Sequence, residues 1–184
     1  EEELRKVSFL QHPQEVMALF ELPESEGVPT EQLRDNLTLA LDDVQDPGNL
    51  GTIIRLADWF GIEHIVCNLG TADAYSPKVV QATMGSIARV KLHYTDLAEY
   101  LEGLQDAVPV YGTFLDGNNI YTEELSATGI IIMGNEGNGI SETVERHVTK
   151  RLLIPSYPAE RPTAESLNVA IATAITCAEF RRRK

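Results

Sequence analysis

The stretch Ile130-Ile131-Ile132-Met133-Gly134-Asn135-Glu136-Gly137-Asn138-Gly139-Ile140-Ser141 runs from an apolar segment into a glycine-rich one. Its apolar part, Ile130–Met133, predicts a short strand. Three glycines within six residues follow, with one acid among them, so the backbone there can approach a flat ligand and bind an adenine or ribose edge. A tight turn in which Ser141 caps the next helix is the alternative interpretation.

Similar apolar runs alternate with amphipathic segments along the chain. Strands are predicted at Leu37–Leu41, Ile65–Cys67, Val90–Leu92, Val108–Phe114, Ile130–Met133 and Leu152–Ile154. Helices are predicted at Asn49–Phe60, Pro77–Ser86, Asp96–Leu104 and Ser166–Phe180. This alternation indicates an α/β fold, with a mostly parallel sheet and helices on both faces. Such sheets bind ligands at the carboxyl ends of their strands, where the glycine-rich loop is expected.

The charge of the chain is uneven. Its 184 residues suffice for one domain with a sizeable core. A net charge of −13 argues against simple nucleic-acid binding, which usually needs a basic surface. Residues 148–184, however, hold seven basic and three acidic residues, a net +4 that leaves −17 on the rest. The terminal Arg-Arg-Arg-Lys is either an RNA contact or a solvated helix end favoured by the helix dipole.

No segment predicts export or membrane insertion. No apolar run approaches the roughly 18 residues that span a bilayer, and no secretory leader is recognisable. Cys67 and Cys177 lie far apart, which favours two buried thiols in a reducing cytosol over a disulfide. The four histidines show no metal-ligand spacing. We therefore expect a soluble, cytoplasmic protein without a metal site.

The beginning of the chain differs from the rest. The sequence starts at Glu1 without a methionine, which leaves open that it is part of a longer protein. The segment Glu21–Arg34 is acidic and interrupted by two prolines and a glycine, which predicts a linker. We expect a boundary near residue 35, with one part at residues 1–35 and a second at residues 36–184.

A second unusual loop, Asp42–Arg55, follows the first predicted strand. Asn49 is placed to cap the next helix, and Gly51 would let another chain approach its first turn closely. Gly51 and Arg55 share a helix face that lies away from the apolar stripe. A capped surface helix with an Arg55–Asp58 ion pair is the alternative. The glycines do not match G-x-G-x-x-G, which weakens a nucleotide-binding oxidoreductase as a reading.

A third segment joins Ile154-Pro155 to Ser166-Leu167-Asn168-Val169 through a polar loop. Ser166 is expected to cap the last helix, whereas Asn168 is unfavourable inside a helix and is harder to explain by structure alone. The predicted helix has an apolar stripe that we expect to be buried, made of Leu167, Ile171, Ala174, Ile175 and Ala178.

Together the three segments resemble the motifs of the SpoU-type RNA 2′-O-ribose methyltransferases of the SPOUT superfamily. The motif N-x-G-x-x-x-R corresponds to Asn49–Arg55, and N-E-G-x-G-(I/L)-S corresponds to Asn135–Ser141. The motif I-P…S-L-N-V corresponds to Ile154-Pro155 and Ser166–Val169. The resemblance covers roughly residues 36–182, and three motifs in the family's order make a chance match improbable.

The resemblance implies a fold, a cofactor and partners. The fold would be a parallel sheet whose C-terminal segment forms a deep trefoil knot, which the general rarity of knots would otherwise exclude. The chain would form a homodimer with the active site across or beside the interface. It would transfer a methyl group from S-adenosylmethionine to a ribose 2′-hydroxyl of rRNA or tRNA. Residues 1–35 would be the remnant of an N-terminal RNA-binding domain and its linker.

The resemblance also assigns roles to residues. Arg55 would stabilise negative charge on the reacting oxygen or a phosphate, rather than act as a base, because a guanidinium holds its proton. The residues that would orient it and the substrate are Asn49, Glu136, Ser166 and Asn168. Those that would contact the cofactor are Gly134, Ile154, Leu167 and, more weakly, Thr113. The alternative is a catalytically silent RNA-binding protein with the same fold.

One departure from the family concerns the third motif. The loop between Pro155 and Ser166 is longer than usual and contains no glycine. Since this loop borders the expected cofactor pocket, the contacts there are expected to differ, and Arg161 is a candidate substrate contact.

Overall fold

The computed structural model describes residues 2–8, 18–22, 28, 30–104, 107–158 and 164–182. The helices of this part are α1 (Glu2–Val7), α2 (Thr30–Asp35), α3 (Pro47–Trp59), α4 (Pro77–Thr83), α5 (Leu97–Gly103), α6 (Glu142–Glu145) and α7 (Val169–Arg182), with a short 3₁₀ helix, η1, at Ser86–Ala88. The strands are β1 (Leu37–Leu41), β2 (His64–Asn68), β3 (Lys91–Thr95), β4 (Val110–Asn119), β5 (Gly129–Met133) and β6 (Lys150–Leu153).

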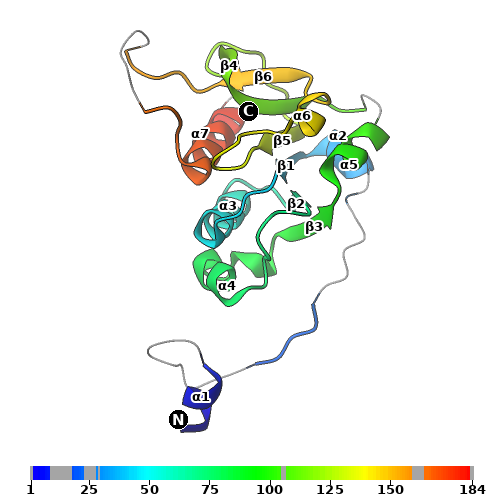
Figure 1. Cartoon of the computed structure of the whole chain (residues 1–184). Coiled ribbons are helices and arrows are strands. Elements are labelled where there is room, and N and C mark those ends of the chain that lie inside the picture. Colours follow the sequence, from blue (N-terminus) through cyan, green and yellow to red (C-terminus); the bar gives the residue numbers. More distant parts are fainter. Residues whose placement is uncertain are drawn as a thin grey trace.

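The strands form one sheet in the order β3-β2-β1-β5-β4-β6, and every pair of neighbours is parallel. This confirms the predicted α/β fold with a parallel sheet (Figure 1). Each strand lies at or within a few residues of its predicted position. β4 runs further than expected, and its pairing with β6 shifts register between Thr113 and Asn118. Because of this register shift, the regular pairing of β4 with β6 is interrupted after Thr113, which therefore lies at the carboxyl end of the regularly paired part of β4.

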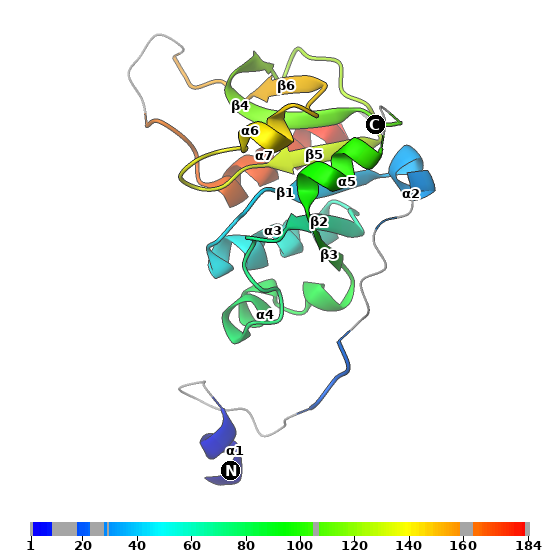
Figure 2. The same cartoon turned by 45° about the vertical axis from the view of Figure 1, so that its right-hand side comes forward.

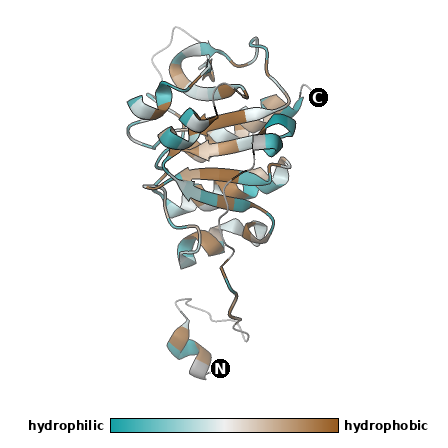
Figure 3. Ribbon diagram, turned by 90° about the vertical axis from the view of Figure 1, so that its right-hand side faces the viewer, coloured by the Kyte–Doolittle hydropathy of each residue, from teal (hydrophilic) through white to brown (hydrophobic). Residues whose placement is uncertain are grey.

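Helices cover both faces of the sheet, as predicted (Figures 1 and 2). Alternate residues of β1 point to opposite sides, as the period of a strand requires. Leu39 belongs to the cluster that packs against α3, α4 and α7, whereas Ala40 belongs to the cluster that packs against α2, α5 and α6. Figure 3 shows the strands mainly in the brown of apolar residues, in keeping with burial on both faces.

Gly51 sets the distance between α3 and α4. It is buried, and a Cβ atom there would overlap the Cβ atom of Ala82 and lie 3.1 Å from the carbonyl oxygen of Val79. Only a glycine lets α4 pack this closely on the first turns of α3. The close approach expected at Gly51 is present, but the segment that approaches is α4 of the same chain and not another chain.

Two predicted helix starts are wrong. Asp46, not Asn49, is the N-cap of α3, and its side chain accepts a hydrogen bond from the backbone N–H of Asn49. Pro47 at the first helical position favours this earlier start. α7 begins at Val169, so Ser166 lies outside the helix. The side chain of Asn168 accepts hydrogen bonds from the first backbone N–H groups of α7 instead.

The last part of the predicted linker Glu21–Arg34 is helical. Thr30–Asp35 forms α2, and Leu33 is fully buried in the core against that side of the sheet. The acidic and proline-rich pattern predicted a linker, although the segment contains one apolar residue, Leu33, that packs in the core. Residues 23–27 and 29 lie outside the described residues, and the division of the chain near residue 35 stays a prediction.

The expected buried stripe of α7 is also wrong. Leu167, just before the helix, and Ile171 are 51% and 53% exposed, and Ala178 is exposed as well. The opposite face, with Thr173, Cys177 and others, packs into the core. Both faces of this helix are apolar in sequence, so periodicity could not decide which one is buried.

The remaining sequence expectations concern thiols and membranes. Cys67 and Cys177 are both free and buried, as predicted, and burial raises the pKa of each thiol to about 12. Among the described helices none has the length and apolarity that a bilayer crossing requires.

Two of the histidines that are scattered along the sequence meet in the fold. His64 on β2 and His93 on β3 are buried, with His64 Nδ1 2.9 Å from His93 Nε2 and the rings stacked. Burial, together with the charges of His64 and Lys91, lowers the pKa of His93 to about 4. Burial lowers the pKa of His64 as well.

We predict that this pair makes stability depend on pH. The unfolded chain protonates both rings below about pH 6.5, whereas the folded protein lowers the pKa of His93 to about 4 and lowers that of His64 as well, so the unfolded state binds more protons as the pH falls below 6.5. The free energy of unfolding should be level above pH 6.5 and fall toward pH 4, by up to about 1.4 kcal/mol per pH unit for each histidine. Urea unfolding at several pH values measures this. The His93→Phe variant should show a shallower slope between pH 6.5 and 5, and an unchanged slope would contradict the assignment.

Candidate active site

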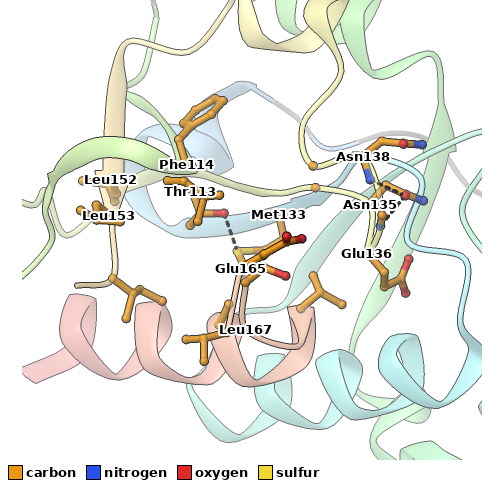
Figure 4. A pocket seen from close by; sticks show the side chains of 18 residues that line it. Thr113, Phe114, Met133, Asn135, Glu136, Asn138, Leu152, Leu153, Glu165 and Leu167 are labelled. Carbon is orange, nitrogen blue, oxygen red and sulfur yellow. Dashed lines mark hydrogen bonds between the residues drawn. The ribbon is translucent and has the colours of Figure 1, made fainter. Parts of the chain in front are cut away.

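A cavity of about 360 Å³ lies at the carboxyl ends of β4, β5 and β6. Four segments line it: Thr113–Leu115 of β4, the loop 134–139 after β5, Leu152–Ile154 at the end of β6, and the approach to α7 with its first turn (Figure 4). The structure thus places the four predicted cofactor contacts, Gly134, Ile154, Leu167 and Thr113, around one space. Two of the residues predicted to orient the substrate, Glu136 and Ser166, line it as well. This is the edge of a parallel sheet at which ligands bind.

The glycine-rich loop after β5 is closed by its own backbone. Asn135 and Gly139 exchange two backbone hydrogen bonds of 2.9 and 3.0 Å, and the Asn135 side chain accepts bonds from the N–H groups of Gly137 and Asn138. Gly139 has a φ of +72°, which favours glycine. The loop is therefore a tight turn and a wall of the cavity at once. Ser141 stands at the N-cap position of α6, but its side chain makes no capping hydrogen bond.

The carboxylate of Glu136 fixes this loop to the loop after β1. One oxygen accepts a hydrogen bond from the backbone N–H of Gln45 at 3.2 Å. The other accepts from the N–H of Asp46 at 3.1 Å and from Asn49 Nδ2 at 2.9 Å. Burial alone would raise the pKa of Glu136, but the hydrogen bonds from Asn49 and the backbone outweigh it and lower the pKa below its usual value. The side chain therefore acts as an anion bound by N–H donors.

Asn49 continues this connection to the third motif. Its Oδ1 accepts a hydrogen bond of 2.9 Å from Asn168 Nδ2, while Asn168 Oδ1 accepts from the first N–H groups of α7. A chain of side-chain hydrogen bonds thus runs from Glu136 through Asn49 to Asn168. The structure brings these three predicted site residues together from segments that lie 32 to 119 positions apart in sequence.

Arg55 does not join this group. It is exposed and lines a different groove, with Trp59 and Met84 among its neighbours. The alternative interpretation, with an Arg55–Asp58 ion pair, is wrong on that pair, because Asp58 pairs with Arg89, whose guanidinium lowers the carboxyl pKa to about 2. The sequence suggested Arg55, which is close to Asp58 along the helix. The actual partner, Arg89, follows η1 and meets Asp58 only in the folded chain.

Sequence analysis also missed residues that build the site. Asp42 is buried; its oxygens accept hydrogen bonds from Asn68 Nδ2 at 3.0 Å and from the backbone N–H of Ser141 at 2.7 Å. It joins the ends of β1 and β2 to the far end of the glycine-rich loop. Glu165 and Met133 line the cavity. An acid directly after a strand, as at Asp42, was the available signal.

The basic C-terminus has structural contacts that were not expected. Arg181 donates hydrogen bonds to the carbonyl oxygens of Phe60 at 2.7 Å and Gly61 at 3.0 Å, where α3 ends. Arg182 pairs with Glu179 of the same helix. Arg183 and Lys184 lie outside the described residues, as does the candidate substrate contact Arg161.

Comparison with known proteins identifies the family. The sequence profile of the SpoU rRNA Methylase family matches residues 36–178. The chain belongs to this family. The predicted resemblance to the SpoU-type enzymes is thereby confirmed. A relative, the 23S rRNA (guanosine(2553)-2′-O)-methyltransferase RlmP of Bacillus subtilis, is 36% identical over 95% of this chain and 68% of its own length. The chain spans only 47% to 66% of seven other curated SpoU relatives.

Solved structures of RNA methyltransferases share the fold. A protein from Porphyromonas gingivalis, described as an RNA methyltransferase of the TrmH family, has a TM-score of 0.89 and 47% identity over 98% of this chain and 71% of its own. An rRNA methyltransferase from Sinorhizobium meliloti, crystallised with AdoMet bound, has a TM-score of 0.73 and 36% identity, covering 82% of this chain and 60% of its own.

We predict that two glycines of the same SpoU loop respond differently to alanine. A Cβ at Gly134 would overlap the backbone of Gly139 and Ile140, so Gly134→Ala should distort the loop and abolish ligand binding in the cavity. A Cβ at Gly137 would meet nothing nearer than 3.6 Å, so Gly137→Ala should bind within about twofold of the unchanged protein. Calorimetric titration with S-adenosylhomocysteine tests both variants, with circular dichroism to verify folding. Equal binding by the two variants would contradict this account of the loop.

Proposed function

We propose that the chain transfers a methyl group from S-adenosylmethionine to a ribose 2′-hydroxyl of rRNA or tRNA. The observation that carries the proposal is the cavity in which the glycine-rich motif and the third motif of a SpoU-family chain meet. The names of RlmP and of the AdoMet-bound Sinorhizobium protein support the reaction and the cofactor. Such a protein acts where RNA is processed, and the two free thiols agree with a cytoplasmic location.

The residues around the cavity fit such a cofactor. Its volume of about 360 Å³ falls within the usual range for ligand sites. Leu152, Ile154 and Leu167 offer an apolar surface for a flat base, and the backbone at Gly134 supplies polar groups without an intervening side chain. When bound, S-adenosylmethionine supplies an electrophilic methyl group on a sulfonium sulfur.

The chain's own residues would position the reactants. Asn49, Glu136 and Asn168 hold the three motifs in register through their hydrogen bonds, and Ser166 lies on the cavity wall. Arg55 would stabilise the negative charge that develops on the 2′-oxygen or a neighbouring phosphate. Placing the hydroxyl in line with the methyl group would supply much of the rate enhancement.

We further propose that a second copy of the chain supplies Arg55. Within one chain Arg55 lines a groove separate from the cavity, so the site of one copy is incomplete. The exposed apolar face of α7 supports a homodimer, because Leu167 and Ile171 are half-exposed and Leu167 also lines the cavity. A copy packed on this face would cover the apolar surface and bring its own α3 toward the cavity.

The trefoil knot is part of this proposal. β6 lies at the edge of the sheet, beyond β4, and the chain then returns so that α7 packs against α3 next to β1 (Figure 1). In the SpoU-type proteins that the sequence resembles, this return passes through a loop of the chain. Residues 159–163, between β6 and α7, lie outside the described residues.

We predict that Arg55→Ala abolishes methylation but leaves cofactor affinity within about twofold, because the proposed contact of Arg55 is with the 2′-oxygen or a phosphate of the RNA and not with the cofactor. Transfer of a labelled methyl group to rRNA and tRNA, followed by nucleoside mass spectrometry, measures the first effect, and calorimetry measures the second. Arg89→Ala, on a neighbouring cation that pairs with Asp58, is the matched control and should retain methylation. Turnover by Arg55→Ala at the normal rate would refute the role of Arg55.

We also predict that two inactive variants restore activity when they are mixed. In a mixed dimer of Arg55→Ala and Gly134→Ala, one cavity is intact and receives Arg55 from the other copy. Random pairing should therefore recover about a quarter of normal activity after co-refolding of equal amounts. If Arg55 serves the cavity of its own chain, the mixture should stay inactive, which would overturn the shared site.

A further inference from the structure

The cavity has an unbalanced charge. Of the described residues that line it, two are carboxylates, Glu136 and Glu165, and none is a lysine, arginine or histidine. Both residues are exposed, so their charges act through surroundings close to those of a protein surface, where a carboxylate still attracts a nearby cation. A cationic ligand is therefore favoured over a neutral one of the same shape.

The two carboxylates differ in what they contact. Glu136 accepts three hydrogen bonds from the loop after β1, so its charge is already compensated by N–H donors. Glu165 makes no hydrogen bond or ion pair with any other residue that the structure describes. In Figure 4 its side chain lies among the residues that line the cavity, between Met133 above and Leu167 below. Glu165 is thus the carboxylate whose charge is available to a ligand.

We propose that Glu165 is a specificity residue that makes the cavity prefer the cationic methyl donor over the neutral product. This rests on the proposed function. In the reaction the S–CH₃ bond breaks and an O–CH₃ bond forms. The bond's electron pair stays on sulfur, and the hydroxyl proton leaves to solvent. S-adenosylmethionine has a net charge of +1 at neutral pH, and S-adenosylhomocysteine, which has lost the sulfonium charge, has a net charge of zero. The carboxylate of Glu165 attracts the positive sulfonium of S-adenosylmethionine, and S-adenosylhomocysteine has no such charge.

The expected size of the preference follows from Coulomb's law. In surroundings between those of bulk water and a protein surface, a carboxylate about 6 Å from any unit positive charge changes affinity by about 3- to 10-fold. Salt screens such an interaction between accessible charges, so the preference should shrink at high ionic strength. Because the product has lost the sulfonium charge, the cavity binds it more weakly than the donor, which favours product release during turnover.

Calorimetry on the whole chain tests the inference with both ligands. Glu165→Gln keeps the shape and removes the charge, so the Kd for S-adenosylmethionine should rise about 3- to 10-fold while that for S-adenosylhomocysteine changes less than about twofold. Glu165→Asp keeps the charge and should keep most of the preference. Glu142→Gln removes an exposed carboxylate of α6 that does not line the cavity, and should change neither Kd.

The outcomes separate this inference from the function on which it rests. If the unchanged protein binds neither ligand, the proposed function fails, and the role of Glu165 fails with it. If the unchanged protein binds both, but Glu165→Gln weakens both equally or neither, the function stands and the role of Glu165 is overturned. A second measurement does not depend on any variant: in the unchanged protein, raising KCl from 0.05 to 1 M should lower the preference for the donor. A preference independent of salt would also overturn the inference.

Discussion

The carboxyl edge of the sheet depends on one anion held by N–H donors. Glu136 lies in a loop that is rich in glycine and therefore has few side chains to pack. Its carboxylate binds the backbone N–H groups of Gln45 and Asp46 and the side-chain amide of Asn49, all at the entrance to α3. Hydrogen bonds to a charged acceptor are stronger than neutral ones, and helix N-termini favour negative charge. The loop thus gains a fixed position without a hydrophobic anchor, and the wall of the cavity can remain bare backbone.

Sheet topology makes this contact possible. β1 and β5 are parallel neighbours, with Leu41 paired to Met133, so both chains leave the sheet at the same edge. Two loops that are about 90 residues apart in sequence therefore begin side by side. Asp42 reinforces the arrangement, because it binds Asn68 at the end of β2 and the N–H of Ser141 at the end of the glycine-rich loop. β6 and α7 then bring the third motif to the same edge. A parallel sheet with another strand order would separate these segments, whatever their individual sequences.

The sequence was sufficient to predict the strands, because they follow from local patterns, whereas the convergence of the motifs was expected from the resemblance to the family. Apolar runs bounded by polar loops located every strand, and parallel order placed their loops together. Several of the errors have a different cause, since a distant partner decided the outcome. Asp58 binds Arg89 from beyond η1 rather than Arg55 within its own helix. Leu33 of α2 is buried only because the sheet lies beneath it. Where two local choices were nearly equal, as between Asp46 and Asn49 for the cap of α3, the proline next to Asp46 was a signal that could have been used.

The orientation of α7 connects the hydrogen-bond network to the surface of the molecule. Asn168 donates to Asn49 and accepts from the first N–H groups of α7, which fixes the rotation of the helix at its beginning. With that rotation, Thr173, Cys177 and Phe180 face the core at the helical period, and Arg181 reaches the end of α3. Leu167 and Ile171 must then face outward beside the cavity, although their side chains are as apolar as those in the core. The contact that aligns the third motif with the first therefore also leaves an apolar face at the mouth of the site. A helix free to rotate would bury that face and remove the surface on which a second copy could complete the site.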